Sequence, residues 1–265
     1  MPDLPETEFD CRALSPASGH TIVATADDLV AVDESGAATW RYPFGSGRPL
    51  GAQRTTCTYS RDGALVWLYL PDVYAGRGAE DRLVLLDAAT GALVDEAPLP
   101  VPGGHSASID LHPDGVHVLL CVGCGQDGTY TFLARATPGS PLACEPWPAD
   151  PAALGSLWLQ GMFEDGSTVL AVTDDGTRIE FRTWPTGDLA WSVTLADLGY
   201  DLESGGIEPL WIGRVVPVAD GRLVVVEVLG EQEDAEGNLT EYTASHGLDW
   251  PGRTVLKQAM RGHRK

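Results

Sequence analysis

The chain has 265 residues, of which 43% are hydrophobic, 8% aromatic and 21% charged, and this composition is typical of a globular protein that can bury its own core. Its 38 acidic and 17 basic residues give a net charge of −21 at pH 7, which would repel nucleic acid and anionic membranes, so we expect neither as a partner. No apolar run approaches the roughly 20 residues that span a bilayer. The acidic stretch Met1–Glu8 does not resemble a signal peptide, and the five cysteines are an odd number, so we expect a cytoplasmic protein without a disulfide framework.

Five short turns ending in glycine divide the chain at nearly regular intervals. They are Ser18-Gly19, Asp62-Gly63, Asp114-Gly115, Asp165-Gly166 and Asp220-Gly221, with glycines 44, 52, 51 and 55 residues apart. Asp-Gly is a frequent two-residue hairpin turn, because a type I′ turn needs positive φ at both central residues. The sequence therefore predicts a hairpin at each of these turns.

Apolar runs typical of strands flank the five turns. In the second repeat Thr56–Tyr59 precedes the turn and Ala64–Tyr69 follows it, and in the fifth Val215–Val218 precedes and Leu223–Val226 follows. A second turn comes later in each repeat, at Asp33–Gly36, Asp87–Gly91, Pro138-Gly139, Pro185–Gly187 and His246-Gly247. Each repeat therefore reads strand, turn, strand, loop, strand, turn, strand.

Four-stranded repeats at intervals of about 50 residues, without helices between them, favour a β-propeller. We predict an all-β fold, a single β-propeller domain over residues 1–265. Its blades, about five and each a four-stranded antiparallel sheet, are expected at 9–44, 45–99, 100–147, 148–195 and 196–262. A β-sandwich is the alternative, although its strands would be spaced less regularly.

Two stretches of the sequence resemble the repeats of the Trp-Asp (WD-repeat) propellers. Gly104-His105, followed by Ser108–Gly115, is similar to that family's Gly-His pair, strand and Ser-Pro-Asp-Gly turn. Arg82–Gly91 resembles its third strand, which ends in Trp-Asp and leads to Thr-Gly, with Leu86 at the tryptophan position. The match is closest in these second and third repeats. It implies a propeller fold in which His105 forms a hydrogen bond within its own blade.

The common catalytic and cofactor motifs are missing or stand in the wrong context. The sequence holds no Gly-x-Ser-x-Gly, and the Gly-x-Gly-x-x-Gly at 123–128 leads into a predicted strand, where no helix N-terminus would hold a phosphate. Cys121 and Cys124 have metal-knuckle spacing but no second ligand pair. His105, His112 and His117 cluster in one repeat, but the alternation of side chains along strands would not point all three at one spot. We therefore predict no metal site and no cofactor.

Acidic residues are the strongest functional lead. Every loop between the second and third strands of a repeat carries acid, and these loops share one rim of a propeller. The candidate residues are Asp72, Glu80, Asp81, Asp127, Asp174, Asp175, Glu231, Glu233, Asp234 and Glu236. Trp147 and Tyr200, among prolines and acids, are predicted to be exposed aromatic residues on the same rim, whereas Trp158 and Trp211 are predicted to pack in the core. The alternative is that the acids at these loop tips only keep the protein soluble and bind no partner.

The leading hypothesis is a non-catalytic scaffold that binds a protein or peptide, one with basic character, on this acidic rim. We expect a monomer. The first alternative is a hydrolase or lyase that uses carboxylates as acid and base at the central channel mouth. The second is a propeller that binds a small molecule or metal without turnover. No catalytic residue can be named from the sequence.

Overall fold

The computed structural model describes residues 11–25, 28–44, 55–71, 80–101, 106–137, 139–148, 157–200, 210–218, 222–233 and 239–256. Within these ranges the chain forms twenty strands and one three-residue 3-10 helix, η1 (Gly125–Asp127). The strands form five four-stranded antiparallel sheets, which we call blades 1 to 5 in chain order. The chain divides into two compact units, Met1–Pro146 and Trp147–Lys265.

The first unit contains blades 1, 2 and 3. Blade 1 consists of β1 (Cys11–Leu14), β2 (Thr21–Ala24), β3 (Asp28–Val32) and β4 (Ala38–Pro43). Blade 2 consists of β5 (Thr56–Tyr59), β6 (Leu65–Leu70), β7 (Asp81–Asp87) and β8 (Leu93–Leu99). Blade 3 consists of β9 (Ser106–Leu111), β10 (His117–Gly123), β11 (Thr129–Arg135) and β12 (Ala143–Pro146).

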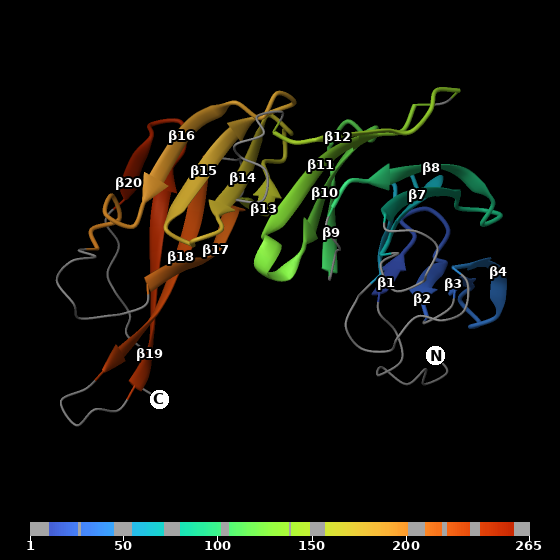
Figure 1. Cartoon of the computed structure of the whole chain (residues 1–265), viewed down its shortest axis with the longest axis horizontal. Coiled ribbons are helices and arrows are strands. Elements are labelled where there is room, and N and C mark those ends of the chain that lie inside the picture. Colours follow the sequence, from blue (N-terminus) through green and yellow to red (C-terminus); the bar gives the residue numbers. More distant parts are fainter. Residues whose placement is uncertain are drawn as a thin grey trace. The chain divides into compact units, whose positions relative to one another are not determined.

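The second unit contains blades 4 and 5. Blade 4 consists of β13 (Leu157–Met162), β14 (Thr168–Thr173), β15 (Arg178–Thr183) and β16 (Leu189–Thr194). Blade 5 consists of β17 (Leu210–Val218), β18 (Leu223–Glu233), β19 (Leu239–Asp249) and β20 (Thr254–Leu256). In Figure 1 the long β18 and β19 run side by side as one hairpin, and their register extends over eleven residue pairs.

In every blade the four strands lie in chain order, each paired antiparallel with its neighbour. Within the first unit β1 contacts β5 and β5 contacts β9, and within the second β13 contacts β17, so the first strands of successive blades lie together. This is the arrangement of propeller blades. The predicted fold class, with five four-stranded antiparallel blades, is confirmed. Each sheet lies within one of the five predicted ranges, and the assignment of all 265 residues to a single domain stays a prediction.

The hairpin turn between first and second strands differs from the predicted type I′ turn. In blade 2 the amide of Gly63 donates to the carbonyl of Ser60, and the amide of Ser60 donates to the carbonyl of Leu65, both at 2.9 Å. Gly63 has φ +72°, but Asp62 is not among the residues with positive φ. Left-handed backbone costs an aspartate more than a glycine, so only the glycine adopts it. Asp62 instead accepts the amide of Ala64 with Oδ1 at 3.0 Å, which stabilises the turn.

The predicted turn at His246-Gly247 is wrong. Both residues lie inside β19, where His246 pairs with Val226 and Gly247 pairs with Val225. The turn to β20 comes later, within residues 250–253. A Cβ at position 247 would lie 3.5 Å from side-chain atoms of Leu223 and Leu256, an ordinary contact distance, so neither a turn nor close packing requires glycine here.

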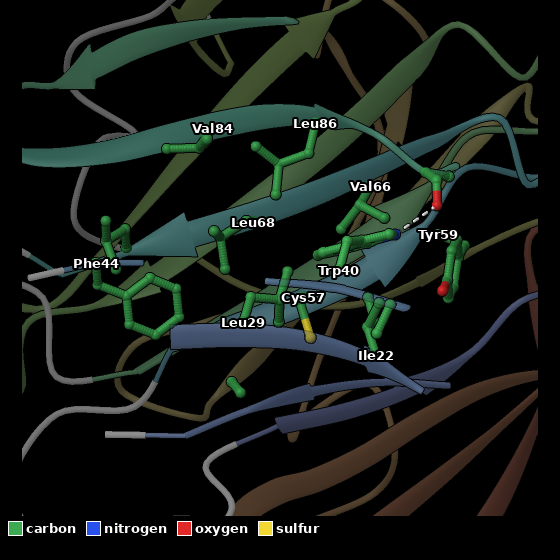
Figure 2. Close-up of a cluster of buried hydrophobic side chains, with 14 residues drawn as sticks. Ile22, Leu29, Trp40, Phe44, Cys57, Tyr59, Val66, Leu68, Val84 and Leu86 are labelled. Carbon is green, nitrogen blue, oxygen red and sulfur yellow. Dashed lines mark hydrogen bonds between the residues drawn. The ribbon is translucent and has the colours of Figure 1, made fainter. Parts of the chain in front are cut away.

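Apolar cores fill the space between neighbouring blades inside each unit. Figure 2 shows the first core, in which Ile22 and Leu29 of blade 1 face Cys57, Val66 and Leu68 of blade 2. A second core joins blades 2 and 3, and a third joins blades 4 and 5. The second strands β6, β10 and β14 are buried along nearly their whole length, and each lies between two other strands of its sheet. Their continuous apolar runs reflect this position.

A tryptophan fixes blade 1 against the outer turn of blade 2. The indole Nε1 of Trp40, on β4, donates to the backbone carbonyl of Ala88 at 2.9 Å, which is the dashed line in Figure 2. Gly91 lies under the ring, with φ +69°, and a Cβ there would be 2.5 Å from the ring carbon Cε3. The second unit repeats the device: Nε1 of Trp147 donates to the carbonyl of Pro185 at 2.8 Å, and Gly187 lies next to the Trp147 ring.

The contact between Gly91 and Trp40 predicts a stability difference between two alanine variants. Gly139 has φ +76° and open space around it, so Gly91→Ala and Gly139→Ala share the left-handed strain but only the first adds the steric clash. We expect Gly91→Ala to lower the free energy of unfolding by about 1–3 kcal/mol more than Gly139→Ala. Urea unfolding followed by circular dichroism measures the difference. Equal losses would contradict the role given to Gly91.

Candidate functional site

Five of the predicted acidic residues have exposed side chains in the described part of the chain: Glu80, Asp127, Asp174, Asp175 and Glu231. The first two belong to the first unit and the other three to the second. Three candidates lie outside the described residues, namely Asp72, Asp234 and Glu236. Glu233 lies on β18, and its side chain is outside the described part as well.

Asp81 occupies a structural position. It is fully buried at the start of β7, and it accepts a hydrogen bond from the hydroxyl of Tyr69 at 2.7 Å. A carboxylate that is enclosed and hydrogen-bonded in this way does not face a partner, so we leave Asp81 out of the candidate site.

Trp147 and Tyr200 do not have the exposed position expected for aromatic rim residues. Trp147 is 2% exposed, with its indole bonded to the carbonyl of Pro185. Tyr200 is partly buried, and its hydroxyl lies 2.7 Å from Nε2 of His246 and 3.2 Å from the hydroxyl of Tyr242. Both side chains reach hydrogen-bond partners inside the protein, which their flanking prolines and acids did not reveal.

The two tryptophans predicted to lie in the core are the exposed ones. Trp158 is 43% exposed and Trp211 is 36% exposed. Each is the second residue of a first strand, β13 and β17 respectively, and these two strands contact each other within the second unit. Two large aromatic side chains thus stand at equivalent positions on adjacent strands.

The turn between β14 and β15 lies against both tryptophans. The carboxylate Oδ1 of Asp174 accepts the indole Nε1–H of Trp158 at 2.7 Å. On the other side, the carbonyl of Gly176 accepts the amide of Ile212 at 2.7 Å, and a Cβ on Gly176 would lie 2.8 Å from the Cβ of Trp211. A side chain at position 176 would push Trp211 away from the turn.

Asp175 is the second acid of this turn. Its Oδ1 accepts the hydroxyl of Thr173 at 2.6 Å and the amide of Thr177 at 3.0 Å. The hydroxyl of Thr173 is the main cause that holds the pKa of Asp175 below its usual value, and the nearby Arg178 guanidinium contributes. Asp175 therefore stays ionised and adds a fixed negative charge beside Asp174.

Glu231 extends the acidic surface on blade 5. Trp211 is paired with Leu229 across the β17–β18 ladder, and Glu231 is two residues further along β18. Residues two apart on a strand leave the sheet on the same face, about 7 Å apart, so Glu231 lies on the face of Trp211. We call Trp158, Asp174, Asp175, Trp211 and Glu231 the tryptophan–acid surface.

A second polar cluster lies at the β9–β10 hairpin of blade 3. Nδ1 of His112 and Nδ1 of His117 lie 2.9 Å and 2.7 Å from the same carboxylate oxygen, Oδ2 of Asp114. Partial desolvation raises the pKa of Asp114, but the amides of His117 and Val116 and the two imidazoles outweigh it and hold that pKa well below its usual value. These three side chains form the group in the described residues whose geometry suits a metal ion.

Two of the three histidines of blade 3, His112 and His117, lie close together in this hairpin, and convergence of all three stays untested. β9 ends at Leu111, so His112 belongs to the turn, and His117 begins β10. The turn then brings His112 and His117 within reach of Asp114, with the rings edge to face and 6.2 Å apart. His105 lies outside the described residues.

The glycine-rich stretch and the cysteine pair of blade 3 have the structural surroundings expected for them. Residues 125–127 form η1, a single 3-10 turn, and β11 follows it, so no long helix begins at these glycines. Cys121 is 7% exposed and Cys124 is 3% exposed.

Comparisons with known proteins identify the fold. No protein-family model matches the sequence, and no curated protein matches it. The β-propeller domain of Cps50 (Swd1) from Myceliophteria thermophila is 13% identical, with a TM-score of 0.54 over 94% of this chain and 86% of that chain. The Dos1 propeller is 10% identical, with a TM-score of 0.55 over 96% of this chain and 70% of that chain. The periplasmic gluconolactonase PpgL of Pseudomonas aeruginosa is 17% identical, with a TM-score of 0.50 over 93% and 83%.

At these identities the likeness establishes a β-propeller fold and nothing about activity. One of the three structures is named as an enzyme and the other two as propeller domains, so the fold is compatible with both functions. No helix in the described residues is long and apolar enough to cross a membrane.

The Tyr200–His246 pair predicts how stability depends on pH. Burial lowers the pKa of His246 below its usual value of 6.5, so the folded state binds this proton less readily than the unfolded chain. The stability that depends on neutral His246 is present above pH 6.5 and is lost as the pH falls from there through the lowered folded-state pKa. We expect the free energy of unfolding to fall more steeply between pH 7.5 and 5 in the native protein than in His246→Gln. Urea unfolding across this range tests it, and identical pH profiles would contradict it.

Proposed function

We propose that this protein is a non-catalytic binding module that holds a basic segment of a partner protein on its tryptophan–acid surface. The proposal concerns the second unit, which contains all five residues of that surface. Catalysis has no part in it. The partner that fits is an exposed peptide segment containing arginine or lysine.

The observation that carries this proposal is the pairing of two exposed tryptophans with an acidic turn. The side chain of Asp174 holds Trp158 through the indole hydrogen bond, so the ring keeps its orientation while 43% of the residue stays exposed. A pre-oriented ring loses little conformational entropy when a ligand binds. Trp211, on the other side of the turn, offers a second ring.

The chemistry of this surface suits a cationic side chain. A guanidinium or ammonium group gains a cation–π interaction over an indole face, and a neighbouring carboxylate adds charge attraction. Asp174 bonds one ring, Asp175 is its neighbour in the same turn, and Glu231 lies on the sheet face of Trp211, so the surface carries three acidic residues. The net charge of −21 would also speed the approach of a basic partner over a longer range.

The exposure of Trp158 and Trp211 favours a role in binding over a purely structural role. Buried Trp40 and Trp147 donate their indole N–H groups to backbone carbonyls inside the protein, as structural tryptophans do. Trp158 and Trp211 keep over a third of their surface accessible. Tryptophans placed in this way are the residues that most often dominate binding energy at protein interfaces.

We also propose that the chain is a WD-repeat-like propeller. The two stretches that resemble the family occupy the expected elements: Ser108–Gly115 spans the end of β9 and the hairpin turn, and Arg82–Gly91 spans β7 and the turn to β8. This assignment is supported by position in the fold and by the two motifs alone.

Binding of a basic peptide tests the proposed function. In about 0.15 M salt, where long-range attraction is screened, a fluorescein-labelled decapeptide of alternating arginine and glycine is titrated with the protein and followed by fluorescence polarisation. We expect Trp211→Ala and Asp174→Asn each to raise the Kd about tenfold, which corresponds to about 1.4 kcal/mol. The matched control is Glu164→Gln, which removes one exposed charge from the β13–β14 hairpin at the other end of blade 4 and should change the Kd less than twofold.

Two results would overturn the proposal. Equal weakening by Asp174→Asn and Glu164→Gln would mean that the peptide responds only to total charge. A Kd unchanged by Trp211→Ala would mean that the aromatic contact contributes nothing to binding. With natural partners, the same three variants are compared in affinity capture from lysate, where a partner of this surface is retained by Glu164→Gln and lost with Trp211→Ala.

A further inference from the structure

The hairpin between β9 and β10 arranges three metal-ligating side chains around one point. His112 directly follows β9, Asp114 lies in the turn, and His117 is the first residue of β10. The potential ligand atoms of the three lie within 4.8 Å of one another. His112 is 6% exposed, so its imidazole is held by the protein interior, whereas Asp114 is exposed to solvent.

The hairpin backbone does not require these imidazoles. In blade 3 the amide of Gly115 donates to the carbonyl of His112. The same backbone bond joins Gly63 to Ser60 in blade 2 and Gly166 to Phe163 in blade 4. The residue equivalent to His112 is therefore a serine in one blade and a phenylalanine in another. By the same pattern the residue equivalent to His117 is Leu65 in blade 2 and Thr168 in blade 4. The histidines thus need an explanation other than the fold.

Hydrogen bonds from the backbone orient the Asp114 carboxylate toward both rings. Its Oδ1 accepts the amides of Val116 and His117 at 2.9 Å and 3.0 Å. The other oxygen, Oδ2, is therefore fixed next to the two Nδ1 atoms, at 2.9 Å from that of His112 and 2.7 Å from that of His117. Backbone bonds of this kind are how proteins hold a ligating carboxylate in place before a metal arrives.

Nδ1 of His112 lies between two polar groups of Asp114. The backbone nitrogen of Asp114 is 3.1 Å from it and the carboxylate Oδ2 is 2.9 Å from it. A metal ion bound at the deprotonated Nδ1 would replace these contacts and bridge to the carboxylate. Ligand atoms around a tetrahedral zinc ion lie about 3.3 Å apart, so the present separations need only small rotations of the side chains to reach it.

We propose that His112, Asp114 and His117 form a binding site for a divalent transition metal, with Zn²⁺ as the ion that two imidazoles and one carboxylate suit best. Three protein ligands leave the remaining coordination positions to water, and this is a site in a solvent-facing hairpin. The site belongs to the first unit and does not depend on the tryptophan–acid surface of the second.

The test is a titration of the full-length, metal-free protein with ZnCl₂ by isothermal titration calorimetry. We expect one saturable site per chain and a higher melting temperature in the presence of zinc. His112→Ser and His117→Thr introduce the residues that blades 2 and 4 carry at these positions, so both variants are expected to fold, which circular dichroism confirms. Each should weaken zinc binding at least tenfold, whereas the control His20→Gln, in another hairpin, should leave it unchanged.

Cobalt absorption identifies the ligands independently of the variants. The chain contains five cysteines, and thiolate ligands give Co²⁺ an intense sulfur-to-metal charge-transfer band that nitrogen and oxygen ligands do not give. Bound Co²⁺ without that band, lost in His112→Ser, supports the proposed ligands. The proposal is overturned by the absence of saturable zinc binding, by equal affinity in all variants, or by a strong thiolate band.

Discussion

The interaction that fixes blade 1 against blade 2, and that recurs in the second unit, is a tryptophan indole N–H donated to a backbone carbonyl in an outer turn. In the first unit Trp40 bonds Ala88 and lies on Gly91, and in the second Trp147 bonds Pro185 and lies beside Gly187. Each bond satisfies the N–H of a buried indole, and the glycine lets ring and backbone come close. Apolar side chains fill the space between neighbouring blades inside each unit, and the Trp40 bond fixes the outer edge beside the first of these cores.

The periodic features of the fold could be predicted from the sequence, because glycine turns and apolar runs are local signals. Asp62-Gly63 and Asp87–Gly91 both lie at turns, and the intervening runs are strands. The type of hairpin turn could not be predicted, since the choice depends on whether the aspartate accepts a positive φ or bonds to the chain ahead of it. Gly247 shows why such a prediction can fail: in the sequence, a glycine inside a long strand cannot be told from a glycine at a turn.

Which tryptophans are buried and which are exposed was the part of the candidate site that the sequence predicted least well. Trp147 is flanked by prolines and preceded by an acid, and its burial depends on a carbonyl 38 residues away. Trp158 lies in an apolar-looking strand, but that strand is the first of its blade, and its side chain reaches the acid at position 174. Both outcomes depend on contacts distant in sequence. The histidine cluster was missed because the histidines were weighed without Asp114, whose carboxylate oxygen contacts both His112 and His117.

The interchangeable hairpin has a consequence for how such a protein can diversify. Serine, histidine and phenylalanine occupy one equivalent position in three blades without changing the backbone hydrogen bonds around it. A repeat copied within a gene could therefore acquire or lose reactive side chains at this position while the other copies preserve the architecture. A change of chemistry can thus arise in a single repeat, at a position where the hairpin backbone accepts three different side chains. The same tolerance would let relatives of this chain carry different residues here and still share its fold.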